Sequence, residues 1–400
     1  MGEWKTYKLC EVADLSTGFP FDGHKYAKEG QRVVRGDNVT IGELRWDKDK
    51  RWNEPFARTE EFSLREGDIV IGMDGSRVGR NRAQIKADDL PLLLAQRVAC
   101  VRHNEKSLQK FLYYQIFSKN FENYIKSVHT GTSIPHVSLK QIGDFSFQVP
   151  DLSTQRRIAG ILGSLDDKIE LNRRINANLE AQAQALFQSW FVDFEPFRDG
   201  PFVDSQLGKI PQGWKVEALS NLATVIKKGI TPSNAETYSH YSIPAYDDAH
   251  FPEKQSGETI KSGKYIVYNN SILLSKLNPR IKRLWFIKTA EENAICSTEF
   301  IPIQTKDTDL ISFVYYLIDN DIFYQHALSL VNGATGSHQR FHAEDIMQIP
   351  FAWNKVAAID FAQKANYILQ KIEDNIRENQ TLSALRDTLL PKLIAGEISC

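Results

Sequence analysis

The sequence repeats itself once, at a spacing of about 203 residues, and this repeat constrains the fold more than any other feature. The apolar run at residues 69–71 returns at residues 272–274. Residues 168–170, Lys-Ile-Glu, return with the same sequence at residues 371–373. Because equivalent residues of a repeat occupy equivalent places in each copy, the 400-residue chain is predicted to fold as two copies of one unit.

Each copy is predicted to begin with strands and to end with a long helix. Short apolar runs broken by Gly, Pro, Asn and Asp are typical of strands, and a helical patch at residues 108–128 interrupts them in the first copy. The long helices are expected to run to about Trp190 and to about Leu390, where Pro391 marks the end of the second. The fold class is therefore α+β. The expected boundaries are residues 1–150 and 196–353 for two globular α/β domains, and residues 151–195 and 354–400 for the two helical segments.

Both helical segments carry an apolar residue at nearly every seventh position, which predicts that the two helices pair as a coiled coil. One asparagine interrupts each series at the same repeat position, Asn172 in the first and Asn375 in the second. A polar residue inside such a seam can specify register at a cost in stability, whereas at the edge of a wide apolar stripe it would be solvated. Both interpretations stay open. The apolar seam positions are Ile158, Leu165, Leu179, Leu186, Phe361, Ile368, Leu382 and Leu389.

An aromatic segment that contains Trp190, Phe191 and Phe194 ends the first helix. Large apolar side chains at such a place either close the end of a helix bundle or stay exposed and recruit a partner protein. We expect a mixed role in which partner docking predominates.

A basic loop follows each of the apolar runs at residues 69–71 and 272–274, and the only acid in the first loop is Asp74. An arginine-bearing loop at the end of a strand suits contact with DNA phosphates or guanine edges, and two similar domains on a stiff spacer suit two half-sites. The alternative is an ordinary solvated loop. At an offset of 203, Arg77 falls on Arg280 and Arg80 falls on Arg283. The candidate contacts are Arg77, Arg80, Arg82, Lys86, Lys276, Arg280, Lys282 and Arg283.

A second pair of loops is rich in Gly, Ser and Thr, and small hydroxyl residues with accessible backbone N–H groups suit phosphates. His136 and Arg340 occupy equivalent places in these two loops. Such sequences are also found in turns that bind nothing. The candidate contacts are Thr132, Ser133, His136, Ser337, His338 and Arg340, and a weaker third candidate is the pair Lys227 and Lys228.

Several classes of function are excluded by what the sequence lacks. With 49 basic and 50 acidic residues, the formal net charge is −1, so any polyanion must be bound by local patches. No phosphate-binding loop, metal-ligand spacing or catalytic triad pattern is present, so no catalytic residue, metal site or cofactor of the chain's own is predicted. Four cysteines far apart, with no export signal or membrane span, predict a cytoplasmic protein.

The sequence of the first helix is similar to that of a known family. Residues 153–159 (Ser-Thr-Gln-Arg-Arg-Ile-Ala), 165–172 and 187–194 closely resemble the central region of the specificity subunits of type I restriction-modification systems. Residues 389–393 look like the C-terminal region of that family. The second helix departs from the pattern, because residues 354–359 replace the Gln-Arg-Arg-Ile of the first, which puts the start of this helix and any partner contact there in doubt.

The resemblance implies a non-catalytic subunit in which each globular domain recognises one half of a bipartite, asymmetric double-stranded DNA site. It also implies that the two helices pack antiparallel, set the gap between the halves, and dock two modification (methyltransferase) subunits. Restriction subunits with translocase and nuclease functions then join. S-adenosylmethionine, ATP and Mg would be bound by those partners, and no membrane is involved.

Two other functions remain as alternatives. The chain could be a coiled-coil adaptor for protein interactions, in which the basic loops are incidental. A self-sufficient nuclease or methyltransferase is disfavoured, because the motifs that such enzymes need are missing.

Overall fold

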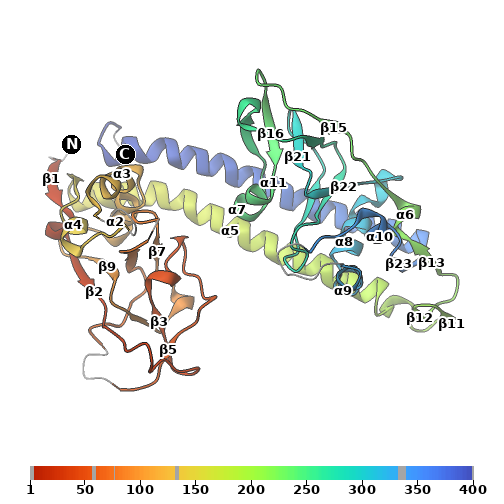
Figure 1. Ribbon diagram of the computed structural model, residues 1–400, viewed down its shortest axis with the longest axis horizontal. Coiled ribbons are helices and arrows are strands. Elements are labelled where there is room, and N and C mark those ends of the chain that lie inside the picture. Colours follow the sequence, from red (N-terminus) through yellow and green to blue (C-terminus); the bar gives the residue numbers. More distant parts are fainter. Residues whose placement is uncertain (1–3, 56–59, 76, 131–134, 332–338, 399–400) are drawn as a thin grey trace. The chain divides into compact units, whose positions relative to one another are not determined.

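The structure, a computed structural model, describes residues 4–55, 60–75, 77–130, 135–331 and 339–398. The chain forms two compact units, the first made of residues 1–167 and 382–400 and the second of residues 168–381 (Figure 1). Each unit contains a strand-rich domain and part of the same two long helices, α5 (Leu152–Phe191) and α11 (Lys355–Ile394). One long helix follows each strand-rich domain, so the predicted α+β fold class is confirmed.

A five-stranded sheet with the strand order β2-β9-β6-β7-β4 forms the centre of the first unit. Its middle strand β6 is buried along its whole length, which explains the continuous apolar run in its sequence. A three-stranded sheet, β5-β3-β8, and the antiparallel pair β1-β10 complete this unit. The bounds are β1 (Lys5–Lys8), β2 (Ala13–Thr17), β3 (Gln31–Val34), β4 (Ile41–Gly42), β5 (Arg51–Trp52), β6 (Ile69–Gly72), β7 (Arg82–Gln84), β8 (Leu92–Leu94), β9 (Val98–His103) and β10 (Ser146–Val149).

The predicted helical patch at residues 108–128 is two helices and not one. Its second part begins at Ser118, whose hydroxyl caps the new helix by accepting a hydrogen bond from the backbone N–H of Phe121 at 3.3 Å. The core of this unit also includes Ile158 from α5 and Leu393 from α11. The short α-helices are α1 (Leu9–Val12), α2 (Gln109–Ile116), α3 (Lys119–Val128) and α4 (Leu139–Gly143), and the 3₁₀ helices are η1 (Gly36–Asn38) and η2 (Ala87–Asp89).

The second unit contains a four-stranded sheet, β14-β22-β19-β20, and a five-stranded sheet, β15-β18-β21-β16-β17. The pair β13-β23 and the hairpin β11-β12 complete its strands. Their bounds are β11 (Phe202–Ser205), β12 (Gly208–Pro211), β13 (Lys215–Ala218), β14 (Ala223–Val225), β15 (Gly229–Ile230), β16 (Thr237–Tyr241), β17 (Glu253–Ser256), β18 (Lys264–Ile266), β19 (Ser271–Ser275), β20 (Leu284–Ile287), β21 (Ala294–Ser297), β22 (Phe300–Thr305) and β23 (Pro350–Trp353). Its short helices are α6 (Leu219–Leu222), α7 (Ile243–Ala249), α8 (Ile311–Asp319), α9 (Asp321–Ser329), α10 (Ala343–Met347), η3 (Glu195–Phe197), η4 (Gly257–Thr259) and η5 (Thr308–Leu310).

The elements of the two units correspond as the sequence repeat predicts. In the first unit β6 pairs with β9 and β7, and in the second β19 pairs with β22 and β20 in the same antiparallel manner. The pair β1-β10 corresponds to β13-β23, since each joins the start of a domain to the strand before its long helix. The two domains are therefore two versions of one scaffold.

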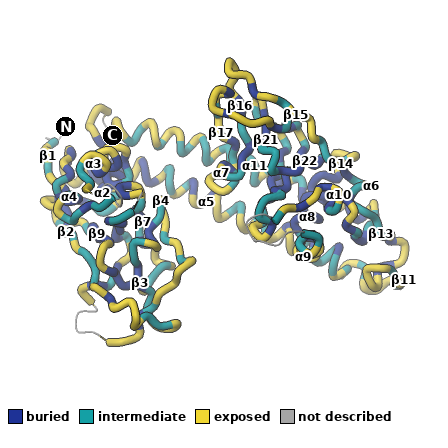
Figure 2. The backbone as a smooth tube through the Cα atoms, in the orientation of Figure 1, coloured by how far each residue is buried: buried dark blue, intermediate teal, exposed yellow. Residues whose placement is uncertain are grey.

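Within the second unit, α5 and α11 pack antiparallel, because Asn172 contacts Asn379 and Phe187 contacts Phe361. Exposed residues alternate with buried or half-buried ones along both helices (Figure 2). The predicted seam positions fall on the packed side: Ile158, Phe361, Asn172 and Asn375 are buried, and Leu165, Leu179, Leu186, Ile368, Leu382 and Leu389 are half-buried.

The second long helix continues past the predicted end at Pro391 and stops at Ile394. The carbonyl of Pro391 still accepts a hydrogen bond from the backbone N–H of Ala395 at 3.1 Å, so the final turn is intact. Burial of Leu393 and Ile394 in the core of the first unit supports this extra turn. None of the described helices combines the length and the hydropathy that a membrane span requires.

Candidate nucleic-acid interface

The two predicted basic loops lie at equivalent places, after β6 in the first unit and after β19 in the second. Arg77 and Arg80 are exposed in the first loop and Arg280 is exposed in the second. Arg80 lies 3.7 Å from Glu122, whereas Arg77 and Arg280 form no ion pair with another described residue. The side chains of Arg77 and Arg280 are therefore available to an anionic ligand.

The two loops differ in length by one residue. In the first, the N–H of Gly72 bonds to the carbonyl of Asn81, and in the second, the N–H of Ser275 bonds to the carbonyl of Arg283. Arg283 thus corresponds to Asn81 in the strand register and not to Arg80, as the constant offset had predicted. Counted from the strand before each loop, Arg77 and Arg280 keep the same position, because they follow Gly72 and Ser275 by the same number of residues.

Two of the predicted contacts have buried guanidinium groups. Arg82 is 7% exposed and lies over the rings of Phe117 and Phe121, and burial lowers its pKa to about 10. Arg283 is 9% exposed and bonds through two nitrogens to the carboxylate of Asp247, at 2.6 and 2.8 Å. Because their charged groups are enclosed by the fold, both residues support the loops and are left out of the proposed contacts.

The ammonium group of Lys282 is also bound by other groups of the protein. Its ammonium lies 2.9 Å from the carboxylate of Asp319 and donates to the backbone carbonyl of the same residue at 2.6 Å. Asp319 accepts a further hydrogen bond from Gln184 of α5 at 2.7 Å. The basic loop of the second unit is thereby anchored to α8 and α5, next to the exposed Arg280.

A half-buried carboxyl group lies beside this anchor. Glu180 of α5 accepts a hydrogen bond from the hydroxyl of Tyr316 at 3.4 Å. Burial, and to a lesser extent the neighbouring charge of Asp319, raise the pKa of Glu180 to about 7. This carboxyl group therefore titrates near neutral pH.

In both units the Gly/Ser/Thr loop is joined by a backbone bridge to the basic loop. The bridge links Asp74 with His136 in the first unit and Leu277 with Arg340 in the second. The two loops that the sequence singled out in each copy are thus brought together. Of their predicted contacts, Thr132, Ser133, Ser337 and His338 lie outside the described residues.

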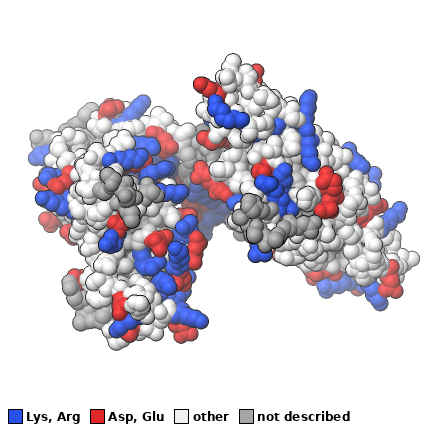
Figure 3. Space-filling view, viewed as in Figure 1, with Lys and Arg blue, Asp and Glu red and all other residues white. Residues whose placement is uncertain are grey.

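The remaining predicted cations have varied surroundings. Lys86 is exposed and precedes η2, while Lys276 is half-buried. Lys227 lies 3.7 Å from Glu344, and Lys228 is exposed at the start of β15. On the visible face of each unit, Lys and Arg are interspersed with Asp and Glu (Figure 3). This agrees with a net charge of −1 and confines any attraction for a polyanion to local groups.

Sequence reasoning missed one charged position in each unit. Arg97 lies in the turn before β9, and one of its guanidinium nitrogens is 2.9 Å from the carboxylate of Asp74. At the equivalent place before β22, Glu299 accepts from Arg340 at 3.2 Å. Both lie outside the basic clusters, so charge density could not reveal them. An alignment of the two copies at the start of β9 and β22 would have placed them together.

A second basic segment of the first unit, near β3 and β5, is partly offset by its own acids. Arg32 and Arg51 pair with Asp49 at 3.5 and 2.8 Å. Arg35 pairs with Asp37 at 3.1 Å. Two carboxylates thus offset part of the positive charge of three arginines in this segment.

The aromatic segment at the end of α5 is mainly internal. Phe191 is buried among the rings of Phe187, Phe313, Trp214 and Phe361. Trp190 and Phe194 are half-buried at the edge of the same cluster.

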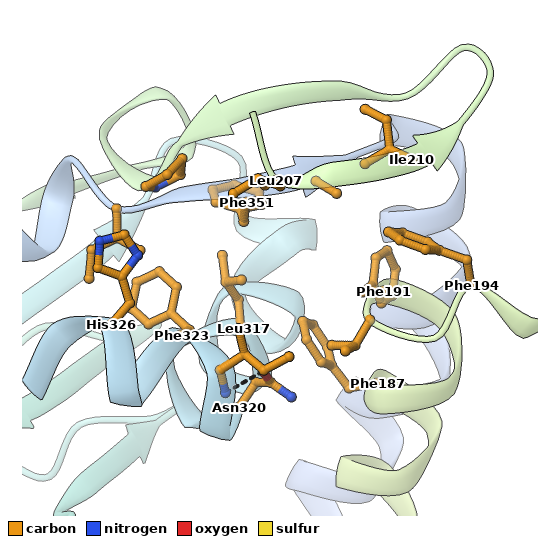
Figure 4. Close-up of a pocket in the computed structure, with 15 residues that line it drawn as sticks. Phe187, Phe191, Phe194, Leu207, Ile210, Leu317, Asn320, Phe323, His326 and Phe351 are labelled. Carbon is orange, nitrogen blue, oxygen red and sulfur yellow. Dashed lines mark hydrogen bonds between the residues drawn. The ribbon is translucent and has the colours of Figure 1, made fainter. Parts of the chain in front are cut away.

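An apolar cavity of about 200 Å³ opens beside the aromatic segment (Figure 4). It lies between the end of α5, the hairpin β11-β12, helix α9 and strand β23. Phe194, Leu207 and His326 are among the residues that line it. The segment thus closes the helix pair and also leaves an apolar opening.

Among the described residues, no group of three or more His, Cys, Asp or Glu side chains is placed to hold a metal ion.

Comparisons with known proteins agree with the resemblance found in the sequence. Residues 1–181 match the family model of the type I restriction modification DNA specificity domain. The specificity subunit of the HindI type I restriction enzyme from Haemophilus influenzae is 25% identical over all of both chains. That of the MjaIX enzyme from Methanocaldococcus jannaschii is 26% identical over 77% of this chain and 73% of the relative. The crystal structure of the S subunit of a type I system from M. genitalium matches with a TM-score of 0.58 at 14% identity, covering 98% of this chain and 96% of that one.

Proposed function

We propose that the chain, like the relatives that it resembles, is a specificity subunit of a type I restriction-modification system, and that each strand-rich domain recognises one half of a bipartite, asymmetric DNA site. The named relatives are specificity subunits, which supports a non-catalytic role. The adaptor alternative is not favoured by this relationship.

The observation that carries the proposal is the matched pair of loops in each domain. In each domain the basic loop carries an exposed arginine that pairs with no described acid, and an equivalent backbone bridge joins this loop to the described end of the Gly/Ser/Thr loop. Arg77 provides that arginine in the first domain and Arg280 in the second. Because phosphate contacts fix position and arginine forks recognise guanine edges, one such loop pair per domain supplies the elements of one half-site.

Five further residues, three in the first domain and two in the second, extend the proposed contacts. Arg80, Lys86 and His136 flank Arg77, and Lys276 and Arg340 flank Arg280. Lys227 and Lys228 are kept as weaker candidates. The weak net charge implies low affinity of the isolated chain for DNA and a need for partners that add contacts.

The long helices serve, in this proposal, as the spacer and as the platform for partner subunits. Their apolar seam, with paired asparagines in it, supports a defined register between α5 and α11. We assign the docking of two modification subunits, followed by restriction subunits, to the helices and to the apolar cavity near Phe194. S-adenosylmethionine, ATP and Mg would then be bound by those partners, in the cytoplasm.

Half-site mapping with matched variants tests the proposal. Methylation mapping in cells that express the chain with its modification subunit identifies the DNA site. Footprinting of the purified complex is then expected to show two protected patches. Arg77→Ala should weaken protection of one patch, and Arg280→Ala should weaken the other.

Charge-matched controls in the same domains are Lys28→Ala and Lys261→Ala, which remove exposed lysines outside the loops. They are expected to leave both patches unchanged. Equal weakening of both patches by either arginine variant, or a single continuous patch, would overturn the proposal.

A further inference from the structure

The backbone of Arg97 has a conformation that residues other than glycine rarely adopt. Its φ is 67°, in the left-handed region, where a residue other than Gly, Asn or Asp costs about 1 kcal/mol or more. Its carbonyl accepts from the N–H of Met73 at 3.1 Å, as that of Glu299 does from Lys276 at 2.9 Å. This hydrogen bond is thus common to both domains, whereas among the described residues the left-handed conformation occurs at Arg97 and not at the equivalent Glu299.

The side chain of Arg97 is held by Asp74. One guanidinium nitrogen lies 2.9 Å from one carboxylate oxygen, and the other oxygen bonds to Nδ1 of His136 at 2.5 Å. Partial burial alone would raise the pKa of Asp74, but the hydrogen bonds from Arg97 and His136 outweigh it and lower that pKa below 3.8. Asp74 is therefore a carboxylate at neutral pH that fixes both neighbours at the edge of the basic loop.

Stability does not account for this arrangement. The side chain of Arg97 is 69% exposed and that of Asp74 is 26% exposed, and ion pairs so open to water contribute little to folding. Arg97 has five N–H donors, and Asp74 uses one of them. Because the side chain is 69% exposed and its partner Asp74 belongs to the loop that carries Arg77, the remaining donors are accessible to an anion beside that loop. A guanidinium group can bind a phosphate or the O6 and N7 atoms of guanine.

The second domain reverses the charges at the same place. Glu299 stands where the first domain has Arg97, Leu277 stands where it has Asp74, and the cation comes instead from Arg340. One scaffold thus presents its guanidinium from the turn before β9 in one domain and from the Gly/Ser/Thr loop in the other. Two half-sites of different sequence require such a difference in donor position.

From these observations we infer that Arg97 is a specificity-determining DNA contact of the first domain and that Asp74 is its positioning residue. The inference rests on the proposed function and adds residues that neither the charge clusters nor the comparisons assign.

The test uses the complex with the modification subunit and duplexes in which each base pair of the mapped site is changed in turn. Arg97→Asn keeps a residue that tolerates the left-handed backbone and removes the guanidinium. It is expected to weaken binding to the intact site by about tenfold and to relax discrimination at a base pair of the first half-site only. Arg97→Gly should do the same with an unchanged or higher Tm, because the backbone strain is removed.

Asp74→Asn tests the positioning role. It should relax discrimination at the same base pair as Arg97→Asn, and the double variant should be no worse than Arg97→Asn alone. Asp49→Asn, which removes a carboxylate from an arginine ion pair away from this turn, is the control and should leave discrimination unchanged.

The possible failures are distinguishable. If Arg97→Asn and Arg97→Gly keep the original discrimination while Arg77→Ala still loses the first half-site, the inference is wrong and the proposed function stands. If no variant of Arg77, Arg97 or Arg280 affects either half-site, the proposed function is wrong as well. Loss of discrimination at both half-sites from Arg97→Asn would also contradict the inference.

Discussion

Asn172 of α5 donates a hydrogen bond to Asn379 of α11 at 2.9 Å, and Asn375 of α11 donates one to Asn176 of α5 at 2.7 Å. Asn375 is the repeat equivalent of Asn172, and Asn379 is that of Asn176. The two hydrogen bonds are therefore related to each other by the internal repeat. Asn172 is fully buried and Asn375 is 2% exposed. The interpretation that these asparagines lie at a solvated edge is therefore wrong, and they lie inside the seam.

We predict that Asn172 and Asn379, one from each long helix, are energetically coupled. Asn172→Ala and Asn379→Ala are each expected to lower the free energy of unfolding, but the double variant should lose about 1 kcal/mol less than the sum, because both changes remove one hydrogen bond. Urea denaturation of the four proteins measures this coupling.

The control is a second set of four proteins in which Gln363→Ala takes the place of Asn379→Ala. Gln363 is exposed and lies near the start of α11. Its effect should add to that of Asn172→Ala within about 0.5 kcal/mol, as expected for distant sites. Additivity in the asparagine pair as well would contradict a role in register.

Arg80 and Arg82 are expected to have opposite phenotypes although both lose one positive charge. Arg82→Ala removes a buried side chain from Phe117 and Phe121 and should cost about 2–3 kcal/mol of stability. Arg80→Ala should change stability by less than about 0.5 kcal/mol, because the side chain is 50% exposed, and should weaken the first half-site. Thermal denaturation and footprinting of both variants separate the two effects. A stable Arg82→Ala protein that loses the half-site would show that Arg82 contacts DNA after all.

The repeat and the hydrophobic periods were enough to predict the two copies, the buried strands β6 and β19, and the long helices. The ends of the helices were harder to predict. Ser118 starts a second helix where one helical patch was expected, and Pro391 does not end α11. Both outcomes depend on tertiary contacts, since burial of Leu393 and Ile394 supports a turn that local preference disfavours. The strand orders, including the parallel pairs β3-β8 and β16-β21, had no local signal in the sequence.

For the candidate site, the places of the loops could be predicted from the sequence, but the surroundings of the individual side chains could not. Charge density identified both basic loops, yet it could not show that Arg82 and Arg283 face inward, because Phe117, Phe121 and Asp247 are distant in sequence. Arg97 was missed for the opposite reason, since it is a single cation outside any cluster. Its role depends on a left-handed turn and on Asp74, which only the fold brings within reach.

Asp166 and Asp167 provide a neighbouring pair for testing how the first unit holds its two helices. Asp166 of α5 accepts from Arg386 of α11 at 2.9 Å and from the hydroxyl of Tyr114 at 2.6 Å. Asp166→Asn should lower the free energy of unfolding by about 1–2 kcal/mol, because it leaves the half-buried guanidinium of Arg386 with less compensation. Asp167→Asn, at a carboxylate that is 74% exposed, should change it by less than about 0.5 kcal/mol. Equal denaturation midpoints for the two variants would refute this role of Asp166.

Glu180 should make the stability of the second unit depend on pH. Its pKa is raised from a usual value near 4.5 to about 7, so the folded chain holds a proton that the unfolded chain releases between these values. The contribution of Glu180 to the free energy of unfolding is therefore complete below about pH 4.5. It is lost progressively as the pH rises to about 7, and the loss is on the order of 2–3 kcal/mol. Glu180→Gln keeps an acceptor for the hydroxyl of Tyr316 and carries no charge. The free energy of unfolding of Glu180→Gln minus that of the original protein should thus rise across this window and level off above about pH 8.

The comparison of the two proteins at each pH cancels the titration of every other group, so the difference reports on Glu180 alone. Glu170→Gln, at an exposed position of the same helix, is the matched control, and its difference from the original protein should not change by more than about 0.5 kcal/mol over the same range. If the free energies of unfolding of Glu180→Gln and the original protein differ by the same amount at pH 4.5 and pH 8, ionisation of Glu180 does not destabilise the folded protein. In that case water or a rearranged Lys282 must solvate it, because Asp319 beside it can only oppose its charge.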